Sequence, residues 1–306
     1  MEPKVIVIVG PTCSGKTELA INLASRLNSE VISADSRQVY KYLNIGTAKP
    51  TKSQLRKVKH HSIDYLNPNE KFNASRFSIT ASKIISGLQE EGKSVIVVGG
   101  SGLYVKALID GIIDEVKVDE DYRTELLELR KQHGNEFLYK KLKNVDPTSA
   151  GKMLPQNWKR VIRALEVYHL TGKSIGHFHS TQNKTEKFLF KIFGINWDRT
   201  KLYENINNRV DLMIADGLVE EVKSILAMGY EKSINALQTV GYKEIISHLG
   251  GEISIEKAIE LIKRNTRHFA KRQLTWFRKD KRIHWLNLND LSELDLVAEN
   301  IIQSLN

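Results

Sequence analysis

An eight-residue run near the amino terminus carries the strongest chemical signal in the sequence. It fits the pattern G-x-x-x-x-G-K-S/T in full, and its members are Gly10, Pro11, Thr12, Cys13, Ser14, Gly15, Lys16 and Thr17. In loops of this type, backbone N–H groups surround phosphate oxygens, the lysine neutralises their charge and the final hydroxyl ligates Mg²⁺. The run therefore predicts a polyphosphate site in which Lys16 is the charged member and Thr17 the metal ligand.

The residues on either side of this run supply the context that a phosphate-binding loop needs. Residues 5–9 are an unbroken apolar run typical of a buried strand, and residues 18–24 continue as a helix. A loop in this position directs the amino terminus of the helix, with its free N–H groups, at a bound anion. The alternative, a glycine-rich turn without a ligand, is disfavoured by the spacing, the Lys-Thr pair and the preceding strand.

A carboxylate follows the second predicted strand. Residues 31–33 are typical of a short buried strand, and Asp35 comes directly after it. Open α/β sheets bind ligands at the carboxyl ends of their strands, so we expect Asp35 to face the phosphate loop across a cleft. Taken alone, an aspartate at such a place is more often a turn or cap residue, and this alternative stays open.

Composition narrows the setting in which the chain works. The sequence has 306 residues, a formal net charge of +10 and a single cysteine, Cys13. Its isoelectric point near 9.4 indicates an anionic partner, most simply a nucleic acid. One cysteine excludes internal disulfides and Cys-rich zinc sites. Because no apolar run reaches the length of a membrane span and the sequence begins almost at its first strand, we expect a cytoplasmic protein without a signal peptide.

The order of the predicted elements indicates an α/β fold. Predicted strands at residues 5–9, 31–33, 94–98, 188–195 and 283–288 alternate with helices, including 74–91 and 199–228, the latter broken at Gly217. Between residues 114 and 187 the pattern is helical only, with helices at 122–132, 136–143 and 158–170. We therefore expect a P-loop NTPase-like parallel sheet flanked by helices, formed by residues 1–113 and 188–306. Residues 114–187 are expected to form an all-helical insertion domain.

Four further segments complete an ordered set of motifs, and they lie at residues 42–50, 99–104, 160–167 and 271–278. Together with the phosphate loop, and in this order over nearly the whole chain, they make the sequence resemble the tRNA dimethylallyltransferases, also called tRNA isopentenyltransferases. The resemblance implies transfer of a dimethylallyl group from dimethylallyl diphosphate to N6 of the adenosine on the 3′ side of a tRNA anticodon. The sequence ends without the zinc-finger extension of the eukaryotic relatives, which indicates the bacterial form.

The resemblance also implies roles for individual residues. Asp35 is the base that takes a proton from the adenine amine, and the phosphate loop with Mg²⁺ holds the diphosphate leaving group. Arg209, which from periodicity alone is a solvated residue of an amphipathic helix, becomes a clamp on the diphosphate oxygens. Ser101 stands where the family usually has threonine, and its hydroxyl keeps a contact to the target nucleotide.

A larger group of positions matches those that contact tRNA in the family. The target adenosine has to leave its stack to reach the diphosphate, and basic side chains must hold the rest of the anticodon stem-loop. The matching residues are Asp35, Ser36, Arg37, Gln38, Ser101, Arg123, Lys159, Arg160, Arg163, Thr239, Gly241, Tyr242, Lys243, Lys271, Arg272, Gln273, Trp276 and Arg278. From the pattern alone, a basic helix is equally a solvated face, and Trp276 is more often a core residue. We expect a monomer that binds tRNA and dimethylallyl diphosphate and no membrane.

Two other functions share parts of this pattern. A P-loop small-molecule kinase has the same loop and sheet, but the strand at 94–98 runs into Gly99 and Gly100 without the carboxylate of a Walker B strand. A free-adenylate prenyltransferase has the same active-site motifs, but needs neither the insertion nor the basic carboxy-terminal helix. The adjacent His60 and His61 point to opposite faces of an extended segment, so structural roles are expected for them rather than a metal site.

Overall fold

The computed structural model describes residues 4–112, 116–181 and 188–305. Its contacts divide the chain into two compact units, one formed by residues 1–109 and 186–306 and the other by residues 110–185. The junctions expected after residues 113 and 187 lie outside the described residues.

A six-stranded sheet, parallel throughout, forms the centre of the first unit. In spatial order its strands are β3 (His60–His61), β2 (Glu30–Ser33), β4 (Val95–Gly99), β1 (Val5–Val9), β5 (Phe190–Trp197) and β6 (His284–Leu288). Both β1 and β4 are buried along their whole length, which explains their continuous runs of Val and Ile. The expected α/β fold class is confirmed, although β3 is not among the predicted strands.

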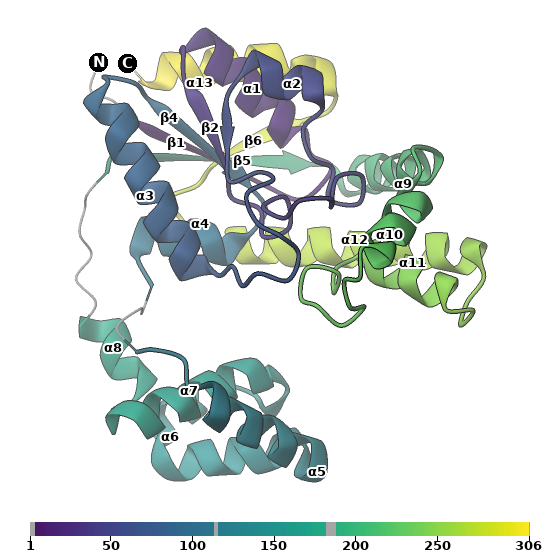
Figure 1. Ribbon diagram of the computed structural model, residues 1–306. Coiled ribbons are helices and arrows are strands. Elements are labelled where there is room, and N and C mark those ends of the chain that lie inside the picture. Colours follow the sequence, from purple (N-terminus) through teal and green to yellow (C-terminus); the bar gives the residue numbers. More distant parts are fainter. Residues whose placement is uncertain (1–3, 113–115, 182–187, 306) are drawn as a thin grey trace. The chain divides into compact units, whose positions relative to one another are not determined.

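Helices cover both faces of this sheet. Figure 1 shows α1 (Lys16–Arg26), α2 (Lys52–Lys57) and α13 (Leu294–Leu305) above it, and α3 (Ala74–Glu90), α4 (Gly102–Asp110) and α12 (Ile255–Phe277) below it. An apolar core lies where α1 and α13 pack on the sheet, around Ile6, Ile8, Leu19 and Leu23. Because β1 leads directly into α1, the loop between them lies at the carboxyl edge of the sheet.

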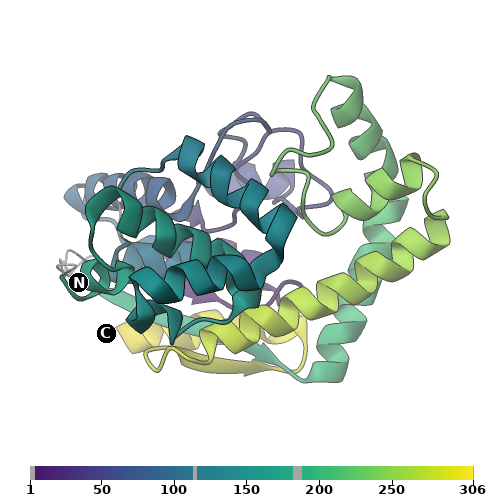
Figure 2. The same ribbon diagram turned by 90° about the horizontal axis from the view of Figure 1, so that it is seen from below.

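A group of helices gathers at the amino-terminal end of α12. These are α9 (Arg199–Ala215), α10 (Leu218–Ala227) and α11 (Tyr242–Leu249), which Figures 1 and 2 show together at that end. Of the three, α9 and α11 pack on α12, and α10 packs on α9 and α11. The break expected at Gly217 is present, because this glycine has φ 96° and separates α9 from α10. A short 3₁₀ helix, Leu291–Glu293, precedes α13.

The second unit contains only helices among its described residues. They are α5 (Glu120–Val145), α6 (Pro147–Ala150), a 3₁₀ turn at Pro155–Asn157, α7 (Trp158–Thr171) and α8 (Ile175–Thr181). At Gly134 the backbone adopts φ 81° and ψ 179°, which interrupts α5 between the two helices predicted there. Its core is formed by Leu126, Leu138, Leu142 and Leu165. In the described part of the chain, no helix is both long enough and apolar enough to cross a membrane.

Candidate active site

The backbone of the phosphate loop is held from two sides. The loop connects β1 to α1, and Gly15 adopts the left-handed φ of 81° that its turn requires. From β5, the indole N–H of Trp197 donates to the carbonyl oxygen of Ser14 at 3.2 Å. From α12, the side-chain oxygen of Gln273 accepts from the N–H of Thr12 at 2.8 Å. The loop is thus fixed by neighbours before any ligand arrives.

Two cations meet at this loop. The ammonium of Lys16 donates to the carbonyl oxygen of Pro11, and Arg209 of α9 reaches the sulfur of Cys13 at 3.5 Å. Burial lowers the pKa of Lys16 to about 8, and the nearby Arg209 acts in the same direction. Neither side chain forms an ion pair with another described residue. Two cations held close together without an ion-pair partner make this a site for an anion.

On the other wall of the cavity, Asp35 closes a turn and presents a free oxygen. Its Oδ1 accepts from the N–H groups of Arg37 at 2.7 Å and Gln38 at 3.2 Å. The second oxygen, Oδ2, has no hydrogen-bond partner within the described residues. Asp35 lines the same cavity as Lys16 and Arg209. Asp35 can therefore hold the turn through Oδ1 and face the cavity with Oδ2 at the same time.

Ser101 lies against this turn. Its hydroxyl oxygen accepts from the N–H of Ser36 at 3.1 Å, and its own N–H donates to the carbonyl oxygen of Ala34 at 3.3 Å. The approach is close because Gly99 has no side chain, and a Cβ there would lie 2.2 Å from the oxygen of Ala34. The segment after β4 and the segment after β2 thus pack directly on each other.

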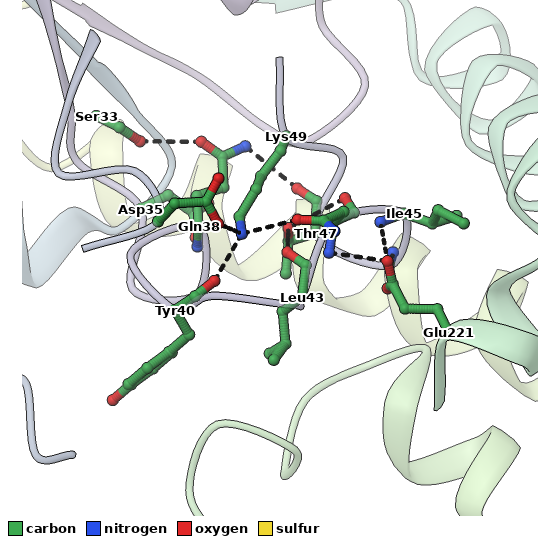
Figure 3. A network of polar contacts seen from close by, with 12 residues as sticks. Ser33, Asp35, Gln38, Tyr40, Leu43, Ile45, Thr47, Lys49 and Glu221 are labelled. Atoms are coloured by element: carbon green, nitrogen blue, oxygen red, sulfur yellow. Dashed lines mark hydrogen bonds and ion pairs between the residues drawn. The ribbon is translucent and has the colours of Figure 1, made fainter. Parts of the chain in front are cut away.

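A polar network shapes the loop at residues 43–49, as Figure 3 shows. The amide of Gln38 accepts from Ser33 at 3.0 Å and donates to the carbonyl oxygens of Thr47 and Ala48 at 3.2 and 3.1 Å. Lys49 is buried, donates to the carbonyl oxygen of Tyr40 at 2.6 Å and pairs with Asp64. Burial lowers the pKa of this lysine. Gln38 and Lys49 are therefore engaged in building the wall of the cavity.

Glu221 of α10 is a member of this network that the sequence analysis did not identify. Its carboxylate accepts from the backbone N–H groups of Asn44, Ile45 and Gly46 at 3.0, 2.8 and 3.2 Å. It also accepts from the hydroxyl of Tyr242 at 2.6 Å, and burial raises the pKa of that hydroxyl. In the sequence, the adjacent Glu220 and Glu221 have the pattern of exposed surface charges. The only hint of a buried partner for Glu221 is Gly46, whose N–H donates to it.

The cavity enclosed by these elements has a volume of about 480 Å³, a size typical of small-ligand sites. The phosphate loop, Asp35, Gln38, Arg209 and Gln273 all line it. Its edge also carries three exposed apolar side chains, which are Leu212, Phe269 and Leu291. The arrangement suits a ligand with a charged end and a small hydrocarbon end.

Thr17 lines the cavity in the first turn of α1, which bears on the predicted metal site. Within the described residues, no group of three or more His, Cys, Asp or Glu side chains could hold a metal ion by itself. A hydroxyl oxygen is a donor that Mg²⁺ accepts, and phosphate oxygens are its usual further ligands. The residues present fit an ion shared between Thr17 and a phosphate ligand.

The structure separates the RNA positions expected in the first unit into exposed and buried side chains. Lys243, Lys271, Arg272 and Arg278 are exposed, and Arg37 donates to Asn235 at 3.4 Å. Gly241 is buried with its N–H on Glu244, Thr239 is half-buried, and Tyr242 is fully buried. Gln273 is 7 % exposed, and Trp276 packs over Gly102, where a Cβ would lie 2.3 Å from the indole. Only the exposed cations are available to an RNA backbone without rearrangement.

In the second unit, two of the four expected RNA contacts surround a buried carboxylate. Glu166 is fully buried and forms ion pairs with Arg123 at 2.8 Å and with Arg163. Arg163 also donates to the carbonyl oxygen of Val116 at 2.8 Å. Lys159 and Arg160 are exposed on α7. Arg123 and Arg163 therefore have a structural role in this unit, which sequence spacing did not reveal.

The predicted structural roles of the two adjacent histidines agree with their contacts. The Nε2 atom of His61 lies 2.6 Å from the carboxylate of Glu30, and Nδ1 of His60 lies 2.8 Å from the carbonyl oxygen of Val58. Burial lowers the pKa of His60, so the neutral ring is favoured.

Comparisons with known proteins give one consistent result. The family model "IPP transferase" matches residues 38–280. The chain is 46% identical to the tRNA dimethylallyltransferase of Acetivibrio thermocellus over 97% of this chain and 96% of that protein. It is 45% identical to the one of Alkaliphilus oremlandii over 99% and 97%, respectively.

Solved structures agree with these sequence relatives. The full-length tRNA isopentenylpyrophosphate transferase of Bacillus halodurans superposes with a TM-score of 0.73 at 38% identity, covering 100% of this chain and 97% of that one. A eukaryotic dimethylallyltransferase acting on tRNA superposes with a TM-score of 0.81 at 29% identity, covering 98% of this chain and 77% of that one.

Proposed function

The chain belongs to the IPP transferase family, as the resemblance in its sequence indicates, and we propose that it prenylates tRNA. The reaction moves a dimethylallyl group from dimethylallyl diphosphate to N6 of the adenosine on the 3′ side of the anticodon and releases diphosphate. The observation that carries this proposal is the cavity itself. It is lined by two cations that form no ion pair with a described residue, Lys16 and Arg209, and by the free oxygen of Asp35.

The leaving group determines what the phosphate loop has to do. Breaking the allylic carbon–oxygen bond leaves its electron pair on the diphosphate, so negative charge grows at the Lys16 and Arg209 wall. Fixed donors at such a place stabilise the transition state, and losing one costs about 3 kcal/mol. Thr17 and the diphosphate oxygens would hold Mg²⁺, which would neutralise part of the same charge.

The nucleophile determines what Asp35 has to do. The lone pair of an exocyclic adenine amine is delocalised into the ring, so attack is assisted when a base removes a proton as the C–N bond forms. Oδ2 of Asp35 receives that proton, while Oδ1 continues to hold the turn. The hydroxyl of Ser101 accepts from Ser36 through its oxygen, which leaves its own proton for a nitrogen of the adenine ring.

Apolar and basic surfaces account for the remaining parts of the two substrates. Leu212, Phe269 and Leu291 at the edge of the cavity contact the five-carbon chain. The target adenosine leaves its stack to enter, and the exposed cations of each unit neutralise phosphates of the anticodon stem-loop. We also propose that the enzyme acts as a monomer in the cytoplasm, a compartment that suits a tRNA substrate and a single, unpaired cysteine.

One experiment distinguishes this function from the two alternatives. The protein is incubated with labelled dimethylallyl diphosphate or with γ-labelled ATP, and each is offered with unmodified tRNA or with AMP. We expect label in tRNA from dimethylallyl diphosphate alone. Label transferred from ATP to a small molecule would indicate a kinase, and prenylated AMP would indicate a free-adenylate transferase. The names of the curated relatives agree with the tRNA reaction and not with either alternative.

A further inference from the structure

Gln273 is a buried amide on a helix whose neighbouring positions are basic and exposed. Lys271 and Arg272 immediately before it are exposed, as is Thr275 just after it, whereas Gln273 itself is 7 % exposed. The Gln273 side chain therefore points into the protein, toward the cavity that it lines, and not to the surface on which these cations lie. Its place in the molecule is set by what it contacts on the inner side of α12.

Both ends of this amide are used, and they join the two walls of the cavity. The oxygen accepts from the N–H of Thr12 at 2.8 Å, and the nitrogen donates to the carbonyl oxygen of Gly100 at 3.0 Å. Thr12 belongs to the phosphate loop after β1, and Gly100 belongs to the segment after β4. One side chain thus bridges two segments that are 88 positions apart in the sequence.

The Gly100 segment leads directly to the acceptor side of the site. The next residue, Ser101, accepts from the N–H of Ser36, which adjoins Asp35. A side chain at position 100 would displace the amide of Gln273, because a Cβ there would lie 2.1 Å from the amide nitrogen. The glycine and the glutamine therefore form one matched contact, which fixes the acceptor side relative to the phosphate loop.

We propose that Gln273 is a positioning residue for the transfer reaction proposed above: its two hydrogen bonds set the distance between the diphosphate loop and the Asp35–Ser101 wall. It touches neither the reacting carbon nor the adenine amine. Transfer requires the amine to meet the allylic carbon in line with the departing diphosphate, and a displacement of about 1 Å lowers such rates by about 100-fold. Removing the bridge lowers the rate of the chemical step and leaves RNA affinity intact.

The test uses two substitutions and a matched control on the same helix. Gln273→Met keeps the length of the side chain and removes both hydrogen bonds. Gln273→Glu keeps the acceptor for Thr12, but its ionised carboxylate cannot donate to Gly100. Thr275→Ala changes an exposed neighbour and is the control.

Single-turnover transfer at saturating tRNA is measured with RNA affinity and melting temperature. We expect the Met variant to lose about 100-fold in rate. Its RNA affinity and the salt dependence of that affinity stay at the wild-type values, as both rate and affinity do for the control. The Glu variant keeps the bond from Thr12 and places a carboxylate against the carbonyl oxygen of Gly100, so its rate is also expected to fall by about 100-fold at unchanged RNA affinity.

Three results overturn the inference. A folded Met variant with a rate within about threefold of wild type shows that alignment does not depend on the bridge. A deficit that disappears at saturating tRNA shows a direct RNA contact instead. A folded Glu variant with a rate within about threefold of wild type, the arm that applies even if Gln273→Met does not fold, shows that the bond to Gly100 has no role. If the wild type itself does not label tRNA, the proposed function fails first.

Discussion

Replacing Lys16 by methionine should have opposite effects on the empty and the occupied protein. In the empty cavity, burial lowers the pKa of this lysine from 10.5 to about 8, with Arg209 adding to the effect. The difference corresponds to about 3 kcal/mol of unfavourable free energy for keeping the charged ammonium in the folded protein. Methionine has a similar length and no charge, so the empty Lys16→Met protein should be more stable than the wild type at pH 7 by up to this amount.

The pH dependence of this difference follows from the direction of the pKa change. Below pH 8, Lys16 is protonated in both the folded and the unfolded protein, and the folded state bears the full cost. Between pH 8 and 10.5, the folded protein binds fewer protons than the unfolded chain, so the unfolding free energy of the wild type rises with pH. The difference in unfolding free energy between Lys16→Met and the wild type should therefore fall to less than half of its pH 7 value by about pH 9.5.

Ligand binding should reverse the order of stability. Pyrophosphate with Mg²⁺ at 100 times its Kd stabilises the wild type by about 2.7 kcal/mol, because it binds only the folded protein. The variant lacks a main contact and should gain little. Urea unfolding followed by tryptophan fluorescence, at both pH values and with and without pyrophosphate, measures all four states. Lys52→Met, at an exposed lysine, is the control.

Two outcomes would refute this reasoning. If the empty variant is no more stable than the wild type at pH 7, the ammonium is not buried at a cost. If pyrophosphate stabilises both proteins equally, Lys16 is not part of the diphosphate site.

Three further predictions concern the base, the metal and the RNA contacts. Asp35→Asn keeps the Oδ1 acceptor of the turn, so melting temperature and substrate affinities should persist while single-turnover transfer falls by about 10² to 10⁴; a near-normal rate would exclude Asp35 as the base. Thr17→Ala should raise the Mg²⁺ concentration needed for half-maximal transfer, and an unchanged titration would argue against Thr17 as a ligand. Neutralising Lys159 and Arg160 together should reduce the slope of log Kd against log salt by about 1.5 without changing the melting temperature. In contrast, Arg163→Ala should lower the melting temperature, because Glu166 is then buried with one partner fewer. If the Lys159/Arg160 variant and Arg163→Ala had the same melting temperature, the distinction between exposed RNA-binding cations and structural arginines would be wrong.

The central strands of the fold were predictable because each is a run of apolar residues long enough to recognise. The strands predicted at 5–9, 31–33, 94–98, 188–195 and 283–288 are all present, with ends displaced by up to two residues. The sixth strand, His60–His61, is too short to produce a periodic pattern. It exists because it pairs with β2, a contact that only the folded sheet provides.

The candidate site was predictable where local sequence determines the chemistry. The phosphate loop and Asp35 each follow an apolar strand, and the structure brings both to one cavity with Arg209. Glu221 was not predictable, because its partners are backbone N–H groups about 175 positions away, and any sequence could supply those. Arg123 and Arg163 are basic residues of the kind that contact RNA. Only the fold shows that both form ion pairs with Glu166.

The end of β4 gives a physical reason why this phosphate loop does not support kinase chemistry of the usual kind. P-loop NTPases hold Mg²⁺ partly through an acidic side chain on the Walker B strand. Here Gly99 and Gly100 occupy the end of that strand, and a Cβ would lie 2.2 Å from the oxygen of Ala34 at one position and 2.1 Å from Gln273 at the other. A side chain at either position would displace these neighbours, and no group of three or more His, Cys, Asp or Glu among the described residues could hold an ion by itself, so an ion at Thr17 would take most of its remaining ligands from the substrate and from water. Mg²⁺ should therefore bind together with a diphosphate and only weakly without one, which suits a loop that holds a leaving group.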